Sequence, residues 1–196
     1  MTPLSRHLCL ALTAAVLLTG AARAEAPAVP QAPEPEQAPR DYVNLRVGVA
    51  TTTRLPVLCL ELAPLEFLSL EACGAGSEYR SASSTASVSH YLVWLKLDSW
   101  KKKVGWLQPR LGAGIAEVQV GPDKGGFQFS GVGPDGVETA GPELGASLRL
   151  LVPVVAGLEG VGELRGTMAY FHHAPKLVHP RSRLEPGAAL TVGVGF

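Results

Sequence analysis

The sequence predicts an all-β fold, an antiparallel up-and-down membrane β-barrel of about eight strands. Three observations lead to this prediction. Apolar residues recur at every second position through most of the chain after residue 40, which is the period of a β-strand. The opposite strand faces combine small residues with a few charges of both signs. Aromatic residues lie near the ends of the expected strands, as they do in membrane barrels.

The N-terminal residues 1–24 are expected to be a secretory signal peptide. A short basic region precedes an apolar run from Leu8 to Leu18, and Ala22 and Ala24 supply the small residues of a cleavage site. The alternative is an uncleaved transmembrane anchor. The apolar run is shorter than the ~20 residues that a membrane-spanning helix needs, which favours the signal peptide.

Residues 25–40 are expected to form a disordered linker, because they are rich in Pro and Ala and contain no aromatic residue. Residues 41–196 then form a single outer-membrane β-barrel domain, which implies a secreted protein. The chain carries 17 basic and 17 acidic residues, and a formal net charge of zero disfavours a nucleic-acid partner.

The alternation is clearest in the first and last expected strands. Val43, Leu45, Val47 and Val49 share one face of the first strand, and Leu190, Val192, Val194 and Phe196 share one face of the last. Further strands are expected within residues 90–98, 107–117, 143–152 and 158–171. Residues 55–79 are interpreted as a hairpin, with a short helix through the Leu-rich middle as the alternative.

The inside and the outside of the barrel are predicted from the two strand faces. A soluble sandwich would carry many long charged residues on its polar face. Here that face is mostly small, and its balanced charges suit a narrow interior in which each charge finds a partner. The aliphatic face then contacts lipid. The predicted interior charges are Arg46, Glu61, Glu71, Lys96, Asp98, Arg110, Glu117, Glu143, Arg149, Glu163, Arg165 and Glu185.

The aromatic residues indicate two rims. Tyr42, Trp100, Trp106 and Phe196 are expected at the periplasmic rim, and Tyr91, Tyr170 and Phe171 at the opposite one. The long connections, residues 121–141 and 172–183, would then lie on the outer side.

With these residues in view, the chain resembles the small outer-membrane β-barrel proteins of Gram-negative bacteria, of the eight-stranded outer-membrane protein A and X type. The resemblance rests on Met1 to Ala24, on "PRLGAGIAEV" and "PELGASLRL", and on the terminal "ALTVGVGF". It implies an outer-membrane monomer in contact with membrane lipid. It also implies that Phe196 belongs to a signal read by the outer-membrane assembly machinery. The Leu-rich segment 55–79 and the low aromatic content depart from the family pattern.

Candidate chemical groups are few. His172, His173 and His179 cluster in one connection, but no carboxylate or thiol accompanies them, so a solvated loop is favoured over a metal site. His90, Asp98 and Ser99 are residue types found in catalytic sites, yet the strand spacing separates them. No catalytic residue, metal site or cofactor is therefore expected. Cys59 and Cys73 can form a disulfide across the hairpin, with two free thiols as the alternative.

The sequence thus predicts a structural or surface-interaction role without enzymatic activity. Two alternatives stay open. One is a narrow channel or a small-molecule-binding barrel, and the other is a soluble periplasmic lipocalin-like barrel with an apolar interior.

Overall fold

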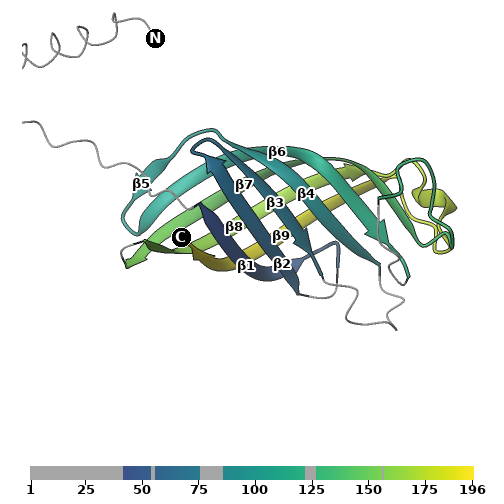
Figure 1. Cartoon of the computed structure of the whole chain (residues 1–196), viewed down its shortest axis with the longest axis horizontal. Helices are drawn as coiled ribbons and strands as arrows, with labels where there is room; N and C mark the ends of the chain where they lie inside the picture. Colours follow the sequence, from purple (N-terminus) through teal and green to yellow (C-terminus); the bar gives the residue numbers. More distant parts are fainter. Residues whose placement is uncertain (1–41, 54–55, 76–85, 122–126, 156) are drawn as a thin grey trace, which may run out of the picture. The chain divides into compact units, whose positions relative to one another are not determined.

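The structure is a computed structural model that describes residues 42–53, 56–75, 86–121, 127–155 and 157–196. The expected signal peptide and linker, residues 1–24 and 25–40, lie outside the described residues. The described part of the chain is built almost entirely from β-strands, as the two-residue period predicts (Figure 1). The elements are β1 (Val43–Ala50), β2 (Val57–Leu65), β3 (Leu68–Gly74), β4 (Ser87–Lys96), β5 (Trp100–Lys102), β6 (Gly105–Gln119), β7 (Glu138–Val155), β8 (Leu158–Tyr170), the short 3-10 helix η3 (Ala174–Lys176) and β9 (Leu184–Gly195).

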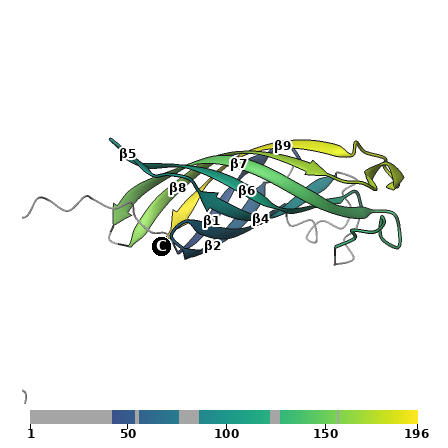
Figure 2. The ribbon, with the colours of Figure 1, turned by 90° about the horizontal axis from the view of Figure 1, so that it is seen from above.

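The strands form a closed sheet in which neighbours in the chain pair antiparallel. The order runs β4-β3-β2-β1-β9-β8-β7-β6, and β4 pairs with β6 to close the ring (Figures 1 and 2). Among the described residues, eight strands therefore complete the barrel. The short β5 is an addition, because it pairs only with the first residues of β6. The predicted eight-stranded, antiparallel, up-and-down barrel is confirmed.

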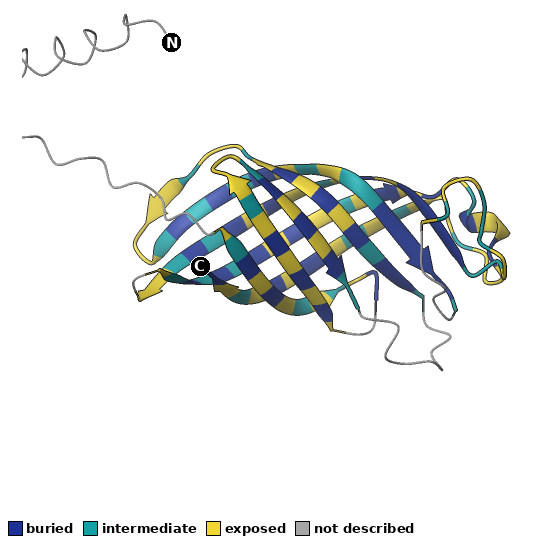
Figure 3. Ribbon diagram, in the orientation of Figure 1, coloured by how far each residue is buried: buried dark blue, intermediate teal, exposed yellow. Residues whose placement is uncertain are grey.

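The side chains alternate between the two faces of the wall along each strand, which gives the chequered pattern of Figure 3. In β9, Leu190, Val192 and Val194 are exposed, whereas Thr191 between them is buried. The outward residues form an apolar belt around the barrel. The belt consists of Leu45, Val47, Val49, Leu58, Leu60, Leu62, Leu70, Tyr91, Val93, Leu95, Leu111, Leu144, Leu148, Leu164, Met168, Tyr170, Leu184, Leu190, Val192 and Val194.

Within residues 56–75, the predicted hairpin is confirmed and the alternative helix is absent. β2 and β3 pair from Leu58–Gly74 to Leu65–Leu68, with an irregularity between Leu62 and Leu65. Pro64 lies in that irregularity, where a residue without an N–H is tolerated in a sheet. The described residues contain no helix with the length and hydropathy needed to cross a membrane.

The two ends of the barrel differ. Phe196 and the short turns lie at one end, and the connections β6–β7 and β8–β9 lie at the other (Figure 1). At the latter end, an apolar cluster lies inside the barrel, with Val88, Val118, Phe171 and Leu177 among its buried residues. The long loop predicted from residue 121 ends earlier than expected, because β7 already begins at Glu138.

The predicted aromatic rims need two corrections. Tyr42, Trp100 and Phe196 are exposed at one end, but Trp106 is buried with Leu151 and Val161 inside the wall. The reason is the alternation of β6, in which position 106 shares its face with the inward Gln108 and Arg110. At the opposite end Tyr91 and Tyr170 are exposed, whereas Phe171 is buried in the apolar cluster.

Candidate functional site: the ion-pair network inside the barrel

Seven charged side chains meet at the centre of the barrel. We call them the ion-pair network: Arg46 of β1, Glu61 of β2, Glu71 of β3, Arg110 of β6, Arg149 of β7, and Glu163 and Arg165 of β8. Each occupies an inward position of an alternating strand, and each is at most 4% exposed. Small neighbours on the same faces, such as Gly112 and Ser147, leave room for these long side chains in a narrow barrel.

Arg46 lies between carboxylates from three strands. Its guanidinium is 2.8 Å from Glu61 and 2.6 Å from Glu163, and it also pairs with Glu71. Its Nε donates to the side-chain oxygen of Asn44 at 2.8 Å. β1 neighbours β2 in the wall, but it does not neighbour β3 or β8. The contacts with Glu71 and Glu163 therefore cross the interior.

Arg110 reaches across the barrel from β6. Its Nη1 donates to Glu61 at 2.7 Å, its Nη2 pairs with Glu163, and its Nε donates to Ser147 at 3.1 Å. The guanidinium also lies over the ring of Trp94, 4.8 Å from the ring centroid. Such a cation–π contact favours a buried cation. Trp94, which is fully buried, thus forms part of the support for the network.

Arg149 and Arg165 complete the network. Arg149 pairs with Glu163 at 3.1 Å and also with Glu61. Arg165 pairs with Glu71, and its Nη1 lies 3.2 Å from the sulfur of Cys73. A guanidinium supplies several donors in a fixed plane, which lets one arginine bridge carboxylates from different strands. The result is a set of cross-links between opposite walls.

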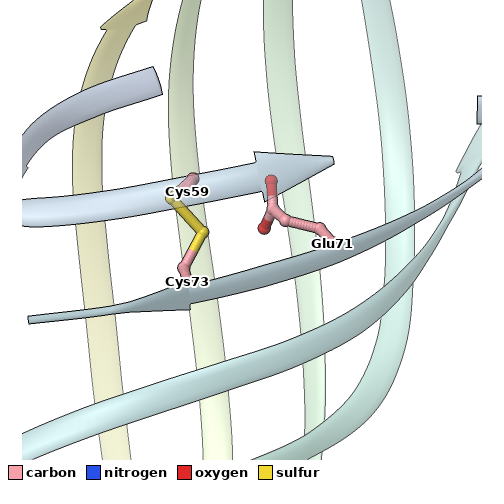
Figure 4. A group of neighbouring side chains, drawn as sticks. All are labelled: Cys59, Glu71 and Cys73. Carbon is pink, nitrogen blue, oxygen red and sulfur yellow. A yellow bond between two sulfur atoms is a disulfide. The ribbon is translucent and has the colours of Figure 1, made fainter. Parts of the chain in front are cut away.

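Cys59 and Cys73 face each other on β2 and β3 and are joined by a disulfide, with their Cα atoms 4.1 Å apart (Figure 4). They are 0% and 3% exposed, and Glu71 lies beside them on the same inward face. The bond therefore faces the sealed interior. Cys59, Glu71 and Cys73 lie close enough together to be candidate metal ligands, as do Glu61, Glu71 and Glu163. In the first group the sulfurs are joined to each other, and in the second the carboxylates pair with arginines, so neither offers a cation a good site.

Four of the five remaining predicted interior charges divide into two sets. Glu143 and Glu117 are buried further toward the loop end, where Glu143 pairs with Nδ1 of His90 at 2.7 Å. Lys96 and Glu185 are only half-buried, and they pair with Glu66 at 3.5 Å and with Arg181 at 2.7 Å, respectively. Both lie at the ends of their strands rather than in the network.

The assignment of Asp98 to the interior is wrong. Asp98 follows the end of β4, is exposed, and accepts hydrogen bonds from Nε1 of Trp100 at 2.5 Å and from the backbone N–H of Ser99 at 2.7 Å. It caps a turn. The alternation placed it on the inward face because counting by two cannot detect where a strand ends. His90 lies inside the barrel with Glu143, so His90, Asp98 and Ser99 do not converge.

Two buried carboxylates, Glu138 and Glu159, are absent from the predicted interior charges. Glu138 is 1% exposed at the start of β7, within a stretch that was assigned to a loop. The contact between Trp94 and Arg110 was not foreseen. Counting by two backward from the inward Glu143 puts Glu138 on the outward face, so the alternation carries no signal for its burial. The sequence carries no signal for the Trp94–Arg110 pair either.

The three loop histidines do not gather into one site. The rings of His172 and His173 contact edge to face with centroids 4.7 Å apart, and His179 is exposed. Among the described residues, none of the three belongs to a group of at least three potential metal ligands. Desolvation and the neighbouring His172, Lys176 and Arg183 lower the pKa of His173 below its usual value.

The polarity of the wall decides the type of barrel. Its interior is crossed by ion pairs and its exterior carries the apolar belt, which reverses the arrangement of a soluble barrel with an apolar interior. The fold is that of an outer-membrane-type barrel. An eight-stranded barrel encloses a space that is just wide enough for side chains to fill. In this outer-membrane-type barrel, the side chains of the ion-pair network occupy the centre of that space.

Comparison with known proteins adds little to this description of the outer-membrane-type barrel. No protein-family model matches the sequence, and no curated protein matches it. Among solved structures, the chain is similar to the N-terminal β-barrel domain of Pseudomonas aeruginosa OprF. The identity is 11% and the TM-score 0.43, over 79% of this chain and 96% of that one. The functional argument therefore rests on the site itself.

Proposed function

We propose that this chain is an integral outer-membrane β-barrel with a structural or surface-interaction role and without catalytic activity. The observation that carries the proposal is the apolar belt, whose members from Leu45 on β1 to Val194 on β9 are 38–66% exposed. Exposed apolar patches of this extent are unfavourable in water. A closed barrel satisfies its backbone hydrogen bonds internally, which is what lipid requires.

We further propose that the barrel is a plug rather than an open pore. This is supported by the cross-links between opposite walls, from Arg149 on β7 to Glu61 on β2 and from Arg165 on β8 to Glu71 on β3, and by the apolar cluster at the loop end. Near Trp94 and Arg110, a cavity of about 30 Å³ lies beside the network, which is room for little more than a water molecule. The end that carries Phe196 faces the periplasm, in keeping with the expected periplasmic linker before β1.

Fractionation tests the membrane assignment. We expect the full-length protein to stay in the outer-membrane fraction after carbonate or urea washing, and its unboiled form to migrate faster than the boiled form on a gel. Release by the wash would contradict the proposal and support a soluble barrel. The lipocalin-like alternative expected an apolar interior, and the interior of this barrel is charged.

A narrow channel is the second candidate, because the interior is polar along much of its length. Planar-bilayer recording separates it from a plug. We expect the reconstituted protein to give almost no conductance, since each guanidinium of the network is held by carboxylates. Stable single-channel steps would favour the channel instead.

A further inference from the structure

The hairpin β5–β6 presents a cluster of cations at the end of the barrel that carries Phe196 (Figure 1). Lys101, Lys102 and Lys103 are consecutive and all exposed, and Val104 at the tip is 64% exposed. The carboxylate of Asp98, just before β5, accepts hydrogen bonds from the backbone of Ser99 and the indole of Trp100. The hairpin tip therefore presents three consecutive lysines beside an exposed valine.

The rings of two tryptophans lie close to two of these lysines. The ammonium of Lys102 lies 5.8 Å from the ring of Trp100, and that of Lys101 lies 6.0 Å from the ring of Trp106. Trp100 is 43% exposed, whereas Trp106 is 8% exposed in the wall. An exposed indole flanked by lysines is the side-chain combination that occurs at membrane–water interfaces. Neither a nucleic-acid surface nor a buried ion-pair site requires it.

The register sets the depth of these groups. Trp100 pairs with Leu107, while Lys101 and Lys102 pair with Trp106 and Gly105, further toward the barrel end. At about 3.3 Å per residue, Lys102 lies about 7 Å beyond Trp100 along the strand. Tyr42 and Phe196, which are 53% and 56% exposed, supply further aromatic rings at this end. The lysines thus lie just outside a ring of interfacial aromatic residues, at the level of lipid headgroups.

We infer that Trp100 and Lys101–Lys103 form a binding surface for the phosphates of anionic lipid headgroups in the periplasmic leaflet. The inference rests on the proposed membrane function and adds the lipid class that this end of the barrel selects. The lysines bind phosphate by charge, and Trp100 holds the hairpin at the interface. Each lysine near an anionic surface contributes enough to favour binding about fivefold.

Spin-labelled lipids test the inference. The full-length protein is reconstituted in phosphatidylcholine vesicles, and the fraction of motionally restricted lipid is compared for spin-labelled phosphatidylglycerol and spin-labelled phosphatidylcholine. We expect the protein to prefer phosphatidylglycerol by at least about fivefold at low salt and to lose the preference at high salt. The combined K101Q, K102Q and K103Q variant should lose it at low salt. The matched control is Lys176→Gln, an exposed lysine in η3 at the opposite end, which should keep it.

The outcomes separate the two proposals. If neither labelled lipid is restricted, the protein is not embedded and the proposed function itself fails. If lipid is restricted equally for both headgroups, the barrel is embedded but the inference is overturned. A preference that survives the triple substitution, or that Lys176→Gln abolishes, places the anion site elsewhere and also overturns it. Should the triple variant not fold, the three single variants are measured in its place, and an unchanged preference in all three overturns the inference.

Discussion

At the scale of single residues, two glutamates illustrate how burial changes the contribution of an ion pair to the free energy of unfolding. Glu61 is fully buried and accepts from Arg46 and Arg110, with Arg149 as a third partner. Glu66 pairs with Lys96 at 3.5 Å, and its side chain is 75% exposed. Exposed pairs contribute roughly 0–1 kcal/mol, whereas breaking a buried pair leaves charges without compensation.

Glu61→Gln should therefore destabilise the barrel by about 3–5 kcal/mol. It leaves the four arginines of the network with two carboxylates, Glu71 and Glu163. The matched control Glu66→Gln should change the free energy of unfolding by less than about 1 kcal/mol. Urea unfolding of the folded protein in lipid vesicles, followed by the heat-sensitive gel shift, measures both. Equal effects from the two substitutions would show that the network does not hold the walls together.

Neighbouring residues of β9 test the inside and outside of the wall. Val192 is 58% exposed on the apolar belt, and Thr191 is 3% exposed, with Nη1 of Arg46 3.5 Å from its hydroxyl. Val192→Arg should cost about 2–4 kcal/mol near the middle of the bilayer. Thr191→Ser keeps the hydroxyl and should change little. The yield of folded barrel in the outer-membrane fraction reports both, and a larger loss from Thr191→Ser would reverse the assignment of the two faces.

The direction of most interior charges could be predicted from the sequence, but their partners could not. Arg46 and Glu163 are inward because each occupies the small-residue face of an alternating strand. Their 2.6 Å contact joins β1 to β8, which are separated by β9, so it depends on how the curvature of the closed barrel brings non-neighbouring strands together. Local alternation carries no information on that distance. For the same reason, it placed Asp98 inside although β4 had already ended.

At the scale of elements, the β2–β3 hairpin was predicted despite the poor alternation of its residues, and its register sets Cys59 opposite Cys73. The length of β6 and β7 was harder to predict. These strands hold 15 and 18 residues, more than the 9 to 11 that crossing a bilayer needs, because their loop-side ends pack over the apolar cluster. Packing of that kind depends on distant residues such as Phe171 and Leu177.

The disulfide of this hairpin should resist reduction for as long as the barrel stays folded. Both cysteines are at most 3% exposed and face the interior, and Arg165 lies against the sulfur of Cys73. Dithiothreitol followed by a maleimide reagent should label the boiled protein and leave the folded protein unlabelled. Equal labelling of both forms would mean that the bond is accessible or unformed.

Replacing both cysteines by alanine gives a second measure of the same element. The bond closes a loop with a sequence separation of 14, so on a chain-entropy estimate it contributes about 3 kcal/mol or less to the free energy of unfolding. The double variant should still form a barrel, because β2 and β3 also pair through their backbones. Complete loss of the folded form would mean that the disulfide contributes more to the free energy of unfolding than the chain-entropy estimate.

At the scale of the whole molecule, the barrel depends on two closures. β4 pairs with β6 over ten residue pairs, from Ser87–Gln119 to Lys96–Arg110, and β1 pairs with β9 over seven, from Asn44–Gly195 to Ala50–Ala189. The second closure joins the first and last strands of the sheet, and an open edge there would expose backbone groups to lipid. Each closing pair was predictable from the strand count, whereas its register was not.

Phe196 extends the second closure by one further pair. Its N–H donates to the carbonyl of Val43 at 3.0 Å, the N–H of Val43 donates back to Phe196 at 3.0 Å, and its side chain is 56% exposed at the rim. Phe196→Ala keeps the backbone bonds and removes the ring, so the seam itself should survive. If the ring is read during assembly, as the resemblance implies, this variant should accumulate as an unfolded periplasmic form, with its signal peptide cleaved normally.

The control for that experiment is Phe196→Tyr, which keeps an interfacial aromatic ring and should assemble like the unsubstituted chain. Pulse labelling followed by the heat-sensitive gel shift measures the rate at which the folded form appears, and urea unfolding of the purified barrel measures its stability. A slow rate with little change in stability assigns the ring to assembly. A normal rate of folding together with a lower free energy of unfolding would mean that the ring only stabilises the folded barrel at the membrane interface and is not needed for assembly.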